Sequence, residues 1–299
     1  MSLEDRVVIV TGAGGGIGRQ HALLLARYGA KVVVNDLGGD VHGEGVTTSA
    51  ADRVVEEIER AGGRAVASYD SVSTQEGGAA ITQVALDAFG RVDAVVHNAG
   101  ILRDRSFAKL SQEELDAVLD VHLKGGFNVT QPAFRVMKEQ GFGRIVLTSS
   151  ASGLLGNYGQ SNYGAAKMGL VGLMHVLAIE GRKHGILANV VAPNALTRMT
   201  EDLLGDLAEA LDPALVSPMV AFLCSERCEI THEIFSVGGG RIARVFVGVA
   251  PGWYGGPTPV ELDDIEANLD RIRSTDGFVI PEDGTGEVRL LIDVLRSSR

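Results

Sequence analysis

Cysteine is scarce in this chain, with two residues among 299, Cys224 and Cys228. Their Cys-x3-Cys spacing fits neither a zinc knuckle nor a redox-active pair, which predicts two free thiols of the kind found in cytoplasmic proteins. Histidine supplies no metal motif either, because the histidines at positions 21, 42, 175, 184 and 232 lack ligand spacing. We therefore expect no metal ion.

The chain also has fewer positively than negatively charged residues. The chain has 27 Lys and Arg against 38 Asp and Glu, a formal net charge of −11, and this balance argues against general nucleic-acid binding. No apolar run approaches the length of a membrane span, and the acidic N-terminal segment is unlike a signal peptide. Because the C-terminal RSSR is not a peroxisomal address, these absences favour a cytoplasmic protein.

Glycine, in contrast, is abundant, with 39 residues. Short runs rich in Val and Ile alternate with segments of helical apolar spacing, such as 19–29 and 49–63, that end on Gly. This alternation predicts an α/β fold: a Rossmann-type, doubly wound parallel sheet of about seven strands with helices on both faces. The clearest strand candidates are the runs at 7–10, 31–36, 92–98, 144–150 and 186–193.

The C-terminal part differs in composition. Residues 241–299 hold four of the eight prolines and the only Trp, Trp253. A capping-box pattern with a favoured Pro predicts a helix in this part. Its cap, first and third helical positions are Thr258, Pro259 and Glu261. We therefore expect a dinucleotide-binding, catalytic domain over 1–240 and an ordered extension over 241–299 that packs on it or on a dimer partner.

The stretch TGAGGGIG (11–18) follows the first predicted strand and opens the first predicted helix. An open α/β sheet binds a dinucleotide at this place. The spacing is G-x3-G-x-G on Gly12, Gly16 and Gly18, with Ile17 before the last glycine. Such glycines let the backbone approach a pyrophosphate, and the helix N-terminus supplies N–H donors. Because a glycine motif alone is a weak signal, a second observation is needed.

Asp36 supplies that observation. It lies 18 residues after Gly18, at the end of the second predicted strand. A carboxylate there accepts hydrogen bonds from both hydroxyls of the adenosine ribose and repels a 2′-phosphate. Since no Arg or Lys lies within the glycine loop to offset that repulsion, the pattern predicts NAD as the cofactor and disfavours NADP.

Tyr163 lies four residues before Lys167, so their side chains share one helix face. A free Tyr has a pKa of about 10, which a nearby ammonium and a positive nicotinamide ring would lower. Tyr163 would then take the proton of an alcohol while hydride leaves its carbon. Ser150, at the carboxyl end of a predicted strand, would bond the same substrate oxygen.

With the Asn-Ala-Gly run at 98–100, these motifs resemble the short-chain dehydrogenase/reductase family. The resemblance implies that Ser150, Tyr163 and Lys167 are the catalytic core. It places Asp70 and Ser71 at the adenine and the stretch 193–197 at the carboxamide of the nicotinamide. The cofactor-binding residues that it implies are Gly12, Gly16, Ile17, Gly18, Asp36, Asp70, Ser71, Asn98, Ala99, Gly100, Tyr163, Lys167, Pro193, Leu196 and Thr197.

The chain departs from the family pattern at His122, where an Asn is usual and is thought to hold a water that links the catalytic Lys to solvent. Imidazole also relays protons near neutral pH, so His122 is a proton-relay candidate and a fourth catalytic residue. The alternative is a His packed against a helix backbone. His97 likewise replaces the first Asn of the usual Asn-Asn-Ala-Gly run.

Several longer stretches resemble one branch of the family, the dehydrogenase region of the type 2 peroxisomal multifunctional enzymes, also called type 4 17β-hydroxysteroid dehydrogenases. They are 32–40, 98–107, 149–163, 178–186 and 192–200. The resemblance implies NAD-dependent oxidation of (3R)-3-hydroxyacyl-CoA to 3-ketoacyl-CoA. A hydroxysteroid or steroid side-chain acyl-CoA dehydrogenase, a 3-ketoacyl thioester reductase and a nucleotide-binding regulator without activity remain alternatives.

The expected partners are a small-molecule substrate and further copies of the chain. Broad apolar faces at 111–139 and 161–184 predict a homodimer or homotetramer. By its place in the family, 201–212 is expected to be a substrate lid. A polyanionic CoA requires local cations in this acidic protein. The candidates are Arg103, Arg105, Lys109 and Arg198.

Overall fold

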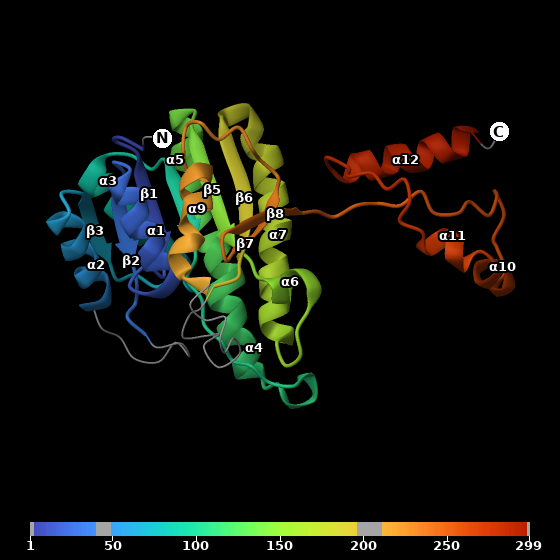
Figure 1. Ribbon diagram of the computed structural model, residues 1–299, viewed down its shortest axis with the longest axis horizontal. Helices are drawn as coiled ribbons and strands as arrows, with labels where there is room; N and C mark the ends of the chain where they lie inside the picture. The colour runs from blue at the N-terminus through green and yellow to red at the C-terminus, as the bar shows by residue number, and fades with distance from the viewer. Residues whose placement is uncertain (1–2, 40–48, 196–210, 298–299) are drawn as a thin grey trace. The chain divides into compact units, whose positions relative to one another are not determined.

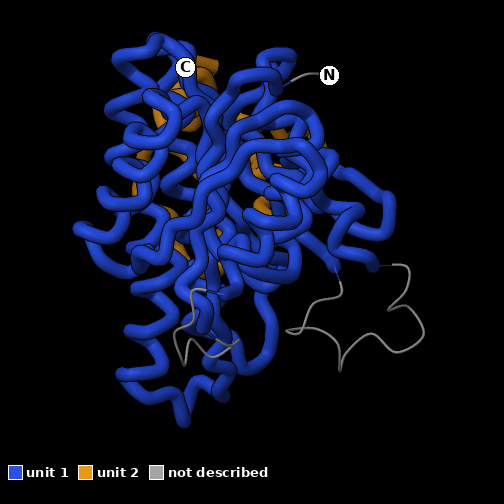
Figure 2. The backbone as a smooth tube through the Cα atoms, turned by 90° about the vertical axis from the view of Figure 1, so that its left-hand side faces the viewer, with its two compact units in different colours: residues 1–244 blue, residues 245–299 orange. Residues whose placement is uncertain are grey.

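The structure is a computed structural model that describes residues 3–39, 49–195 and 211–297. The chain divides into two compact units, Met1–Arg244 and Val245–Arg299 (Figure 2). The first unit contains the sheet and every residue proposed for catalysis or cofactor binding. The second unit covers most of the extension expected over 241–299.

A single sheet organises the first unit, with strand order β3-β2-β1-β4-β5-β6-β7-β8 (Figure 1). Neighbours from β3 through β7 pair in parallel. The order runs outward from β1 in one direction and from β4 in the other, which is the doubly wound arrangement that the sequence predicts. The strands are β1 (Val7–Thr11), β2 (Lys31–Asn35), β3 (Arg64–Ser68), β4 (Ala94–His97), β5 (Gly143–Thr148), β6 (Ile186–Pro193), β7 (Ile234–Gly238) and β8 (Arg241–Val245).

Helices cover both faces of this sheet. The helices α1, α2 and α9 pack on one face, and α3, α5 and α7 pack on the other. The α-helices of the first unit are α1 (Gly16–Arg27), α2 (Ser49–Arg60), α3 (Gln75–Phe89), α4 (Gln112–Leu119), α5 (Gly125–Gln140), α6 (Ala151–Leu155), α7 (Ser161–Gly181) and α9 (Ser217–Leu223). Short 3-10 turns are η1 (Phe107–Lys109), η3 (Arg182–His184) and η6 (Pro213–Leu215).

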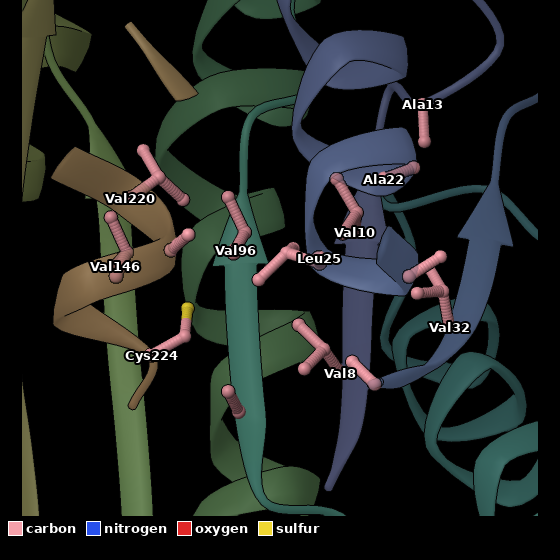
Figure 3. Close-up of a cluster of buried hydrophobic side chains, with 14 of the residues drawn as sticks. Val8, Val10, Ala13, Ala22, Leu25, Val32, Val96, Val146, Val220 and Cys224 are labelled. Carbon is pink, nitrogen blue, oxygen red and sulfur yellow. The ribbon is translucent and has the colours of Figure 1, made fainter. Parts of the chain in front are cut away.

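Burial on both faces explains why the strand sequences are continuously apolar. All five residues of β1 are buried: Val8 and Val10 belong to the core cluster beneath α1 and α9, while Val7 and Ile9 point the other way. Burying one such side chain contributes about 1.5–3 kcal/mol. Figure 3 shows this core, with labels on Val8, Val10, Ala13, Ala22, Leu25, Val32, Val96, Val146, Val220 and Cys224.

Both cysteines are free and buried, as their spacing predicted. Burial raises the pKa of the Cys224 thiol to about 12, so it packs as a small apolar side chain. Among the described residues, no group of three potential metal ligands occurs. Within the same ranges, no helix is both long enough and apolar enough to cross a bilayer.

The sheet has eight strands, one more than expected. The extra strand, β8, follows β7 after two residues, Gly239 and Gly240, which have φ of 56° and 77°. Positive φ at both positions is typical of a type I′ hairpin turn, so β8 runs antiparallel to β7 at the edge. Its sequence, RIARV, carries two cations and is mostly exposed, so it lacks the apolar signal of the central strands.

The segment 111–139, expected as one helix, contains an irregularity. A π turn, η2 (Asp120–Lys124), separates α4 from α5, and the N–H of Gly125 donates to the carbonyls of both Asp120 and His122. Single π turns inside helices widen the backbone and often mark functional sites. Here the turn places His122 in the interior, where it is 1% exposed.

The second unit contains three helices, α10 (Leu262–Ala267), α11 (Leu269–Arg273) and α12 (Gly284–Ser297). The predicted cap position was wrong: α10 begins three residues later, with Glu261 as its N-cap. The reason is a competing capping box, in which Asp264 accepts the N–H of Glu261 at 3.1 Å. The rings of Phe246 and Phe278 stack with centroids 5.2 Å apart.

Candidate active site

The glycine loop turns tightly between β1 and α1. Gly12 and Gly16 have φ of +63° and +51°, a region that favours glycine. A Cβ on Gly18 would lie 2.2 Å from the Gly12 carbonyl oxygen, so this contact also requires glycine. A Cβ on Gly16 would meet nothing within 4 Å, so the loop leaves open space on that side.

The N-terminus of α1 faces this loop without a side-chain cap, because its N-cap residue is Gly15. The first-turn N–H groups are therefore available to an anion, and the helix dipole favours negative charge there. Together with the open space beside Gly16, this end of the helix fits a dinucleotide pyrophosphate.

Asp36 directly follows β2, and backbone amides hold both of its carboxylate oxygens. Oδ2 accepts the N–H of Gly14 and Oδ1 accepts the N–H of Gly38, each at 2.7 Å. A Cβ on Gly14 would lie 2.8 Å from the carboxylate, so glycine is needed for this approach. Each oxygen keeps a lone pair for a ribose hydroxyl, whereas a 2′-phosphate would meet a fixed negative charge.

Asp70 and Ser71 follow β3, next to the strand that carries Asp36. The Asp36 N–H donates to the Ser68 carbonyl at 3.0 Å, and Asn35 Nδ2 donates to the Asp70 carbonyl at 2.9 Å. The Ser71 hydroxyl is 2.8 Å from the hydroxyl of Ser73. The structure therefore brings both residues to the Asp36 end of the site.

The segment after β4 is bonded to the start of the glycine loop. Thr11 Oγ1 accepts the N–H groups of Asn98 and Ala99, each at 3.1 Å. Asn98 Nδ2 lies 3.3 Å from the carbonyl oxygens of Thr11 and Gly12. Gly100 is also required as glycine, because a Cβ there would lie 2.2 Å from His122 Cε1.

Pro193 ends β6, and the next residue, Asn194, donates its N–H to the Val237 carbonyl at 2.7 Å. Leu196 and Thr197 of the expected nicotinamide stretch lie outside the described residues. The same is true of Arg198 and of most of the expected lid.

Ser150, Tyr163 and Lys167 meet where β5, α6 and α7 converge. Ser150 is the N-cap of α6, and its hydroxyl lies close enough to the phenol of Tyr163 to affect the pKa of that phenol. Lys167 Nζ lies 5.6 Å from the Tyr163 ring centroid and donates to the Thr148 carbonyl at 2.6 Å. The three side chains therefore form one group at the carboxyl end of β5.

Burial controls the proton affinities of this group. Burial raises the pKa of Tyr163, the nearby Ser150 hydroxyl opposes the rise, and Asp104 adds to it. Burial also lowers the pKa of Lys167 to about 7. In the protein alone, desolvation therefore determines the direction of the Tyr163 pKa shift. The lowering expected from Lys167 together with a positive nicotinamide ring stays a prediction.

His122 lies beside this group, with its ring edge-on to Tyr163 and the centroids 5.1 Å apart. Its Nε2 is 2.8 Å from the Ile101 carbonyl oxygen and 3.0 Å from the Ile101 N–H nitrogen. Burial and the Lys167 charge hold its pKa well below the ordinary value. The buried Nδ1 has no hydrogen-bond partner among the described residues, and this atom supports a relay role.

Asn162 is a site residue that the sequence analysis missed. It is 1% exposed, and its Nδ2 donates to the carbonyls of Arg103 and Glu114 at 2.9 and 3.2 Å. Its Oδ1 accepts the N–H of Tyr163 at 2.8 Å. Asn162 thereby fixes the start of α7, but its partners are 59 and 48 residues away, so no local spacing indicates the contact.

The candidate CoA-binding cations differ in their surroundings. Arg105 is exposed and pairs with Glu114, with Nη2 and Oε1 2.8 Å apart. Such a surface pair contributes at most about 1 kcal/mol, so Arg105 remains able to exchange its partner for a phosphate. Lys109 is exposed in η1, and Arg103 is half-buried.

Comparisons with known proteins agree with this geometry. A family model described as short chain dehydrogenase matches residues 6–207. The chain is 56% identical over 244 residues to a putative short-chain type dehydrogenase/reductase of Mycobacterium tuberculosis, over 81% of this chain and 85% of that one. Fold, site and similarity thus define an oxidoreductase that acts on a CH–OH group. The chain belongs to the short-chain dehydrogenase/reductase family.

Two further relatives are larger proteins. The chain is 56% identical over 246 residues to peroxisomal multifunctional enzyme type 2 of Mus musculus, over 82% of this chain and 33% of that one. The solved full-length peroxisomal multifunctional enzyme type 2 of Drosophila melanogaster is similar with a TM-score of 0.84 and 38% identity, over 99% of this chain and 50% of that one. The chain thus spans a third to a half of these relatives.

Proposed function

We propose that the protein is an NAD-dependent dehydrogenase that oxidises (3R)-3-hydroxyacyl-CoA to 3-ketoacyl-CoA. The observation that carries the proposal is the grouping of Ser150, Tyr163 and Lys167 beside a dinucleotide loop. The substrate class rests on the resemblance to the type 2 multifunctional enzymes, of which the mouse enzyme is 56% identical to this chain.

In this proposal NAD, when bound, supplies the hydride acceptor. Tyr163 takes the hydroxyl proton of the substrate as general base. The Ser150 hydroxyl accepts the N–H of Ser152 at 3.2 Å, so its own proton remains available to the substrate oxygen. Lys167 is about half protonated near pH 7, and its charge favours the phenolate of Tyr163. One hydride and one proton thus leave the alcohol.

The choice of NAD rests on Asp36. Its carboxylate is immobilised by two backbone amides, so it cannot swing away from a 2′-phosphate. Removing both the charge and its hydrogen bonds should therefore weaken NAD binding and reduce the discrimination against NADP.

A substrate panel tests the proposal against its alternatives. Purified protein is mixed with NAD and either a 3-hydroxyacyl-CoA, a 17β-hydroxysteroid or a steroid side-chain hydroxyacyl-CoA, and NADH absorbance is followed. A parallel assay offers a 3-ketoacyl thioester with NADPH. We expect the highest kcat/KM for the 3-hydroxyacyl-CoA with NAD. Turnover confined to a steroid, or to thioester reduction with NADPH, would replace the proposal by that alternative.

We also propose a homodimer, because apolar side chains remain exposed on α5 and α7. They are Phe127 (50%), Met168 (41%), Val176 (51%) and Ile179 (49%). Exposed apolar side chains gathered on neighbouring helices favour association with a second copy. The mass of the protein in solution tests this proposal.

The cell compartment also remains a proposal. The sequence favours the cytoplasm, whereas two relatives are named peroxisomal enzymes. Fluorescence microscopy of the full-length chain with an internal tag would decide between them. Diffuse signal is expected, and punctate signal would overturn the cytoplasmic assignment.

A further inference from the structure

His97, the last residue of β4, has no role in the reaction described above. It is 1% exposed, and both of its ring nitrogens lie near hydrogen-bonding atoms. Nδ1 is 3.3 Å from Thr11 Oγ1, and Nε2 is 3.0 Å from the His122 carbonyl oxygen. The ring thus lies between the end of β1 and the π turn η2.

The partners of His97 determine where its proton lies. The His122 carbonyl can only accept, so Nε2 must donate. Thr11 Oγ1 already accepts the N–H groups of Asn98 and Ala99, so its own proton goes to Nδ1. The neutral ring protonated on Nε2 therefore satisfies every group in this network. In agreement, burial and the charge of Lys167 lower the pKa of His97 to about 4.

This bond matters because of the carbonyl that receives it. Within η2 the His122 carbonyl accepts the N–H of Gly125, and His97 fills its second lone pair. The start of α5 leaves space for the ring: a Cβ on Gly125 would lie 3.3 Å from His97 Cε1, and one on Gly126 would lie 3.7 Å from Cδ2. The turn held in this way carries the His122 side chain that faces Tyr163.

We propose that His97 is a positioning residue for the reaction, which holds η2, and with it the His122 ring beside Tyr163, at a fixed place relative to the glycine loop that follows Thr11. This inference rests on the proposed function. It assigns His97 no contact with substrate or cofactor.

Two substitutions test the hydrogen bonds of the two ring nitrogens of His97 one at a time. In His97→Gln the amide nitrogen takes the place of Nε2 and keeps the bond to the His122 carbonyl. In His97→Asn the amide oxygen takes the place of Nδ1 and keeps only the bond to Thr11. We expect kcat within about threefold of the parent for His97→Gln and at least about tenfold lower for His97→Asn, with the Kd for NADH unchanged in both.

His21→Asn is the matched control, because His21 is also buried, with Nδ1 2.8 Å from the Ser217 hydroxyl in the contact between α1 and α9. An Asn there keeps that bond, so kcat should not change. Equal kcat in His97→Asn and His97→Gln would overturn the proposal. So would a loss in His97→Asn confined to NADH affinity or to Tm.

A spectroscopic measurement tests His97 without turnover. Nitrogen-15 NMR of histidine-labelled protein should show one ring, absent in His97→Gln, that keeps the Nε2–H tautomer and stays neutral at pH 5.5. An Nδ1–H tautomer, or titration of this ring near pH 6.5, would contradict the inference. If the parent protein oxidised no substrate, the proposed function would fail while this spectrum would still decide the placement of His97.

Discussion

At the scale of single residues, burial shifts the pKa values of two catalytic groups in opposite directions. Desolvation raises the pKa of Tyr163 and lowers that of Lys167, so burial favours the neutral form of both. A charged Lys167 and a positive nicotinamide would shift Tyr163 back toward the phenolate. In the protein alone Tyr163 therefore holds its proton more tightly than a free tyrosine, and it is expected to act as a base when the cofactor is bound.

The rate of oxidation should follow the ionisation of Tyr163. Because a raised pKa means that the proton is held more tightly, the phenolate increases only as pH rises. We expect kcat/KM for oxidation to increase with pH, by up to about tenfold per unit, between pH 6 and 9. A pH profile at saturating NAD checks this. A flat profile over that range would mean that the base is already ionised at pH 6.

Asp36 should decide the cofactor. Asp36→Ala removes the carboxylate that two backbone amides hold in place and that is proposed to bind the ribose hydroxyls. The KM for NAD should therefore rise by about 10- to 100-fold while the preference over NADP falls. Initial-rate kinetics with both cofactors measure this. Asp87→Ala, an exposed carboxylate on α3, is the control and should change neither KM. An unchanged NAD-to-NADP ratio in Asp36→Ala would contradict the role of this residue.

Residues in local motifs were predictable from the sequence, and residues with distant partners were not. Tyr163 and Lys167 are one helical turn apart, and Asp36 lies at a fixed offset from the glycine loop. Asn162 and His97 instead bond to segments 25 to 86 residues away in the sequence, and nothing in their local sequence indicates those contacts. Their place in the site follows only from the folded chain.

At the scale of elements, the central strands match their predicted runs because burial on both faces gives them a continuous apolar sequence. The last of them, β6, has the predicted limits, 186–193. The edge strand β8 and the π turn η2 were not predictable. Strand β8 is largely exposed, so its sequence lacks a continuous apolar run. The turn η2 depends on the packing of His122 against Gly100, which are far apart in the sequence.

Gly100 and His122 should behave as a coupled pair. Gly100→Ala places a Cβ 2.2 Å from His122 Cε1, so it should lower the free energy of unfolding by about 1–3 kcal/mol and reduce kcat. His122→Asn alone should leave activity largely intact if the side chain acts as a relay. Because Asn is shorter, the double variant should recover part of the stability that Gly100→Ala loses.

The free energy of unfolding in denaturant and kcat are measured for the parent, Gly100→Ala, His122→Asn and the double variant. His122→Leu is the matched control, since it keeps the bulk and loses the bonds to Ile101. If Gly100→Ala and His122→Asn are additive, the contact does not couple them. A collapse of activity in His122→Asn would contradict the relay role.

At the scale of the whole molecule, the main feature that the catalytic site does not explain is a set of exposed apolar side chains. The second unit has no fully buried residue among those described, and it exposes large apolar side chains on all three of its helices. In the first unit, α5 and α7 carry exposed large apolar side chains at Phe127, Met168, Val176 and Ile179. Sequence periodicity could predict that these faces are apolar, but it could not say what covers them.

Charges on α7 should disrupt association. Val176→Glu combined with Ile179→Glu places two carboxylates on the exposed face of this helix, where each parent side chain is about half exposed. Light scattering after size exclusion should show a shift from the dimer to the monomer mass of 31.4 kDa. The control must be an exposed residue on another helix, so Val55 on α2, which packs on the core, is unsuitable. Asp87→Lys on α3 is suitable, and it should stay dimeric.

The most direct test of the whole account is NADH formation from matched (3R)- and (3S)-3-hydroxyacyl-CoA with NAD. The account predicts reduction with the (3R) epimer only, and a loss of at least about 100-fold in Tyr163→Phe with NADH binding kept. Reduction of NAD with the (3S) epimer, or undiminished activity in Tyr163→Phe, would contradict it.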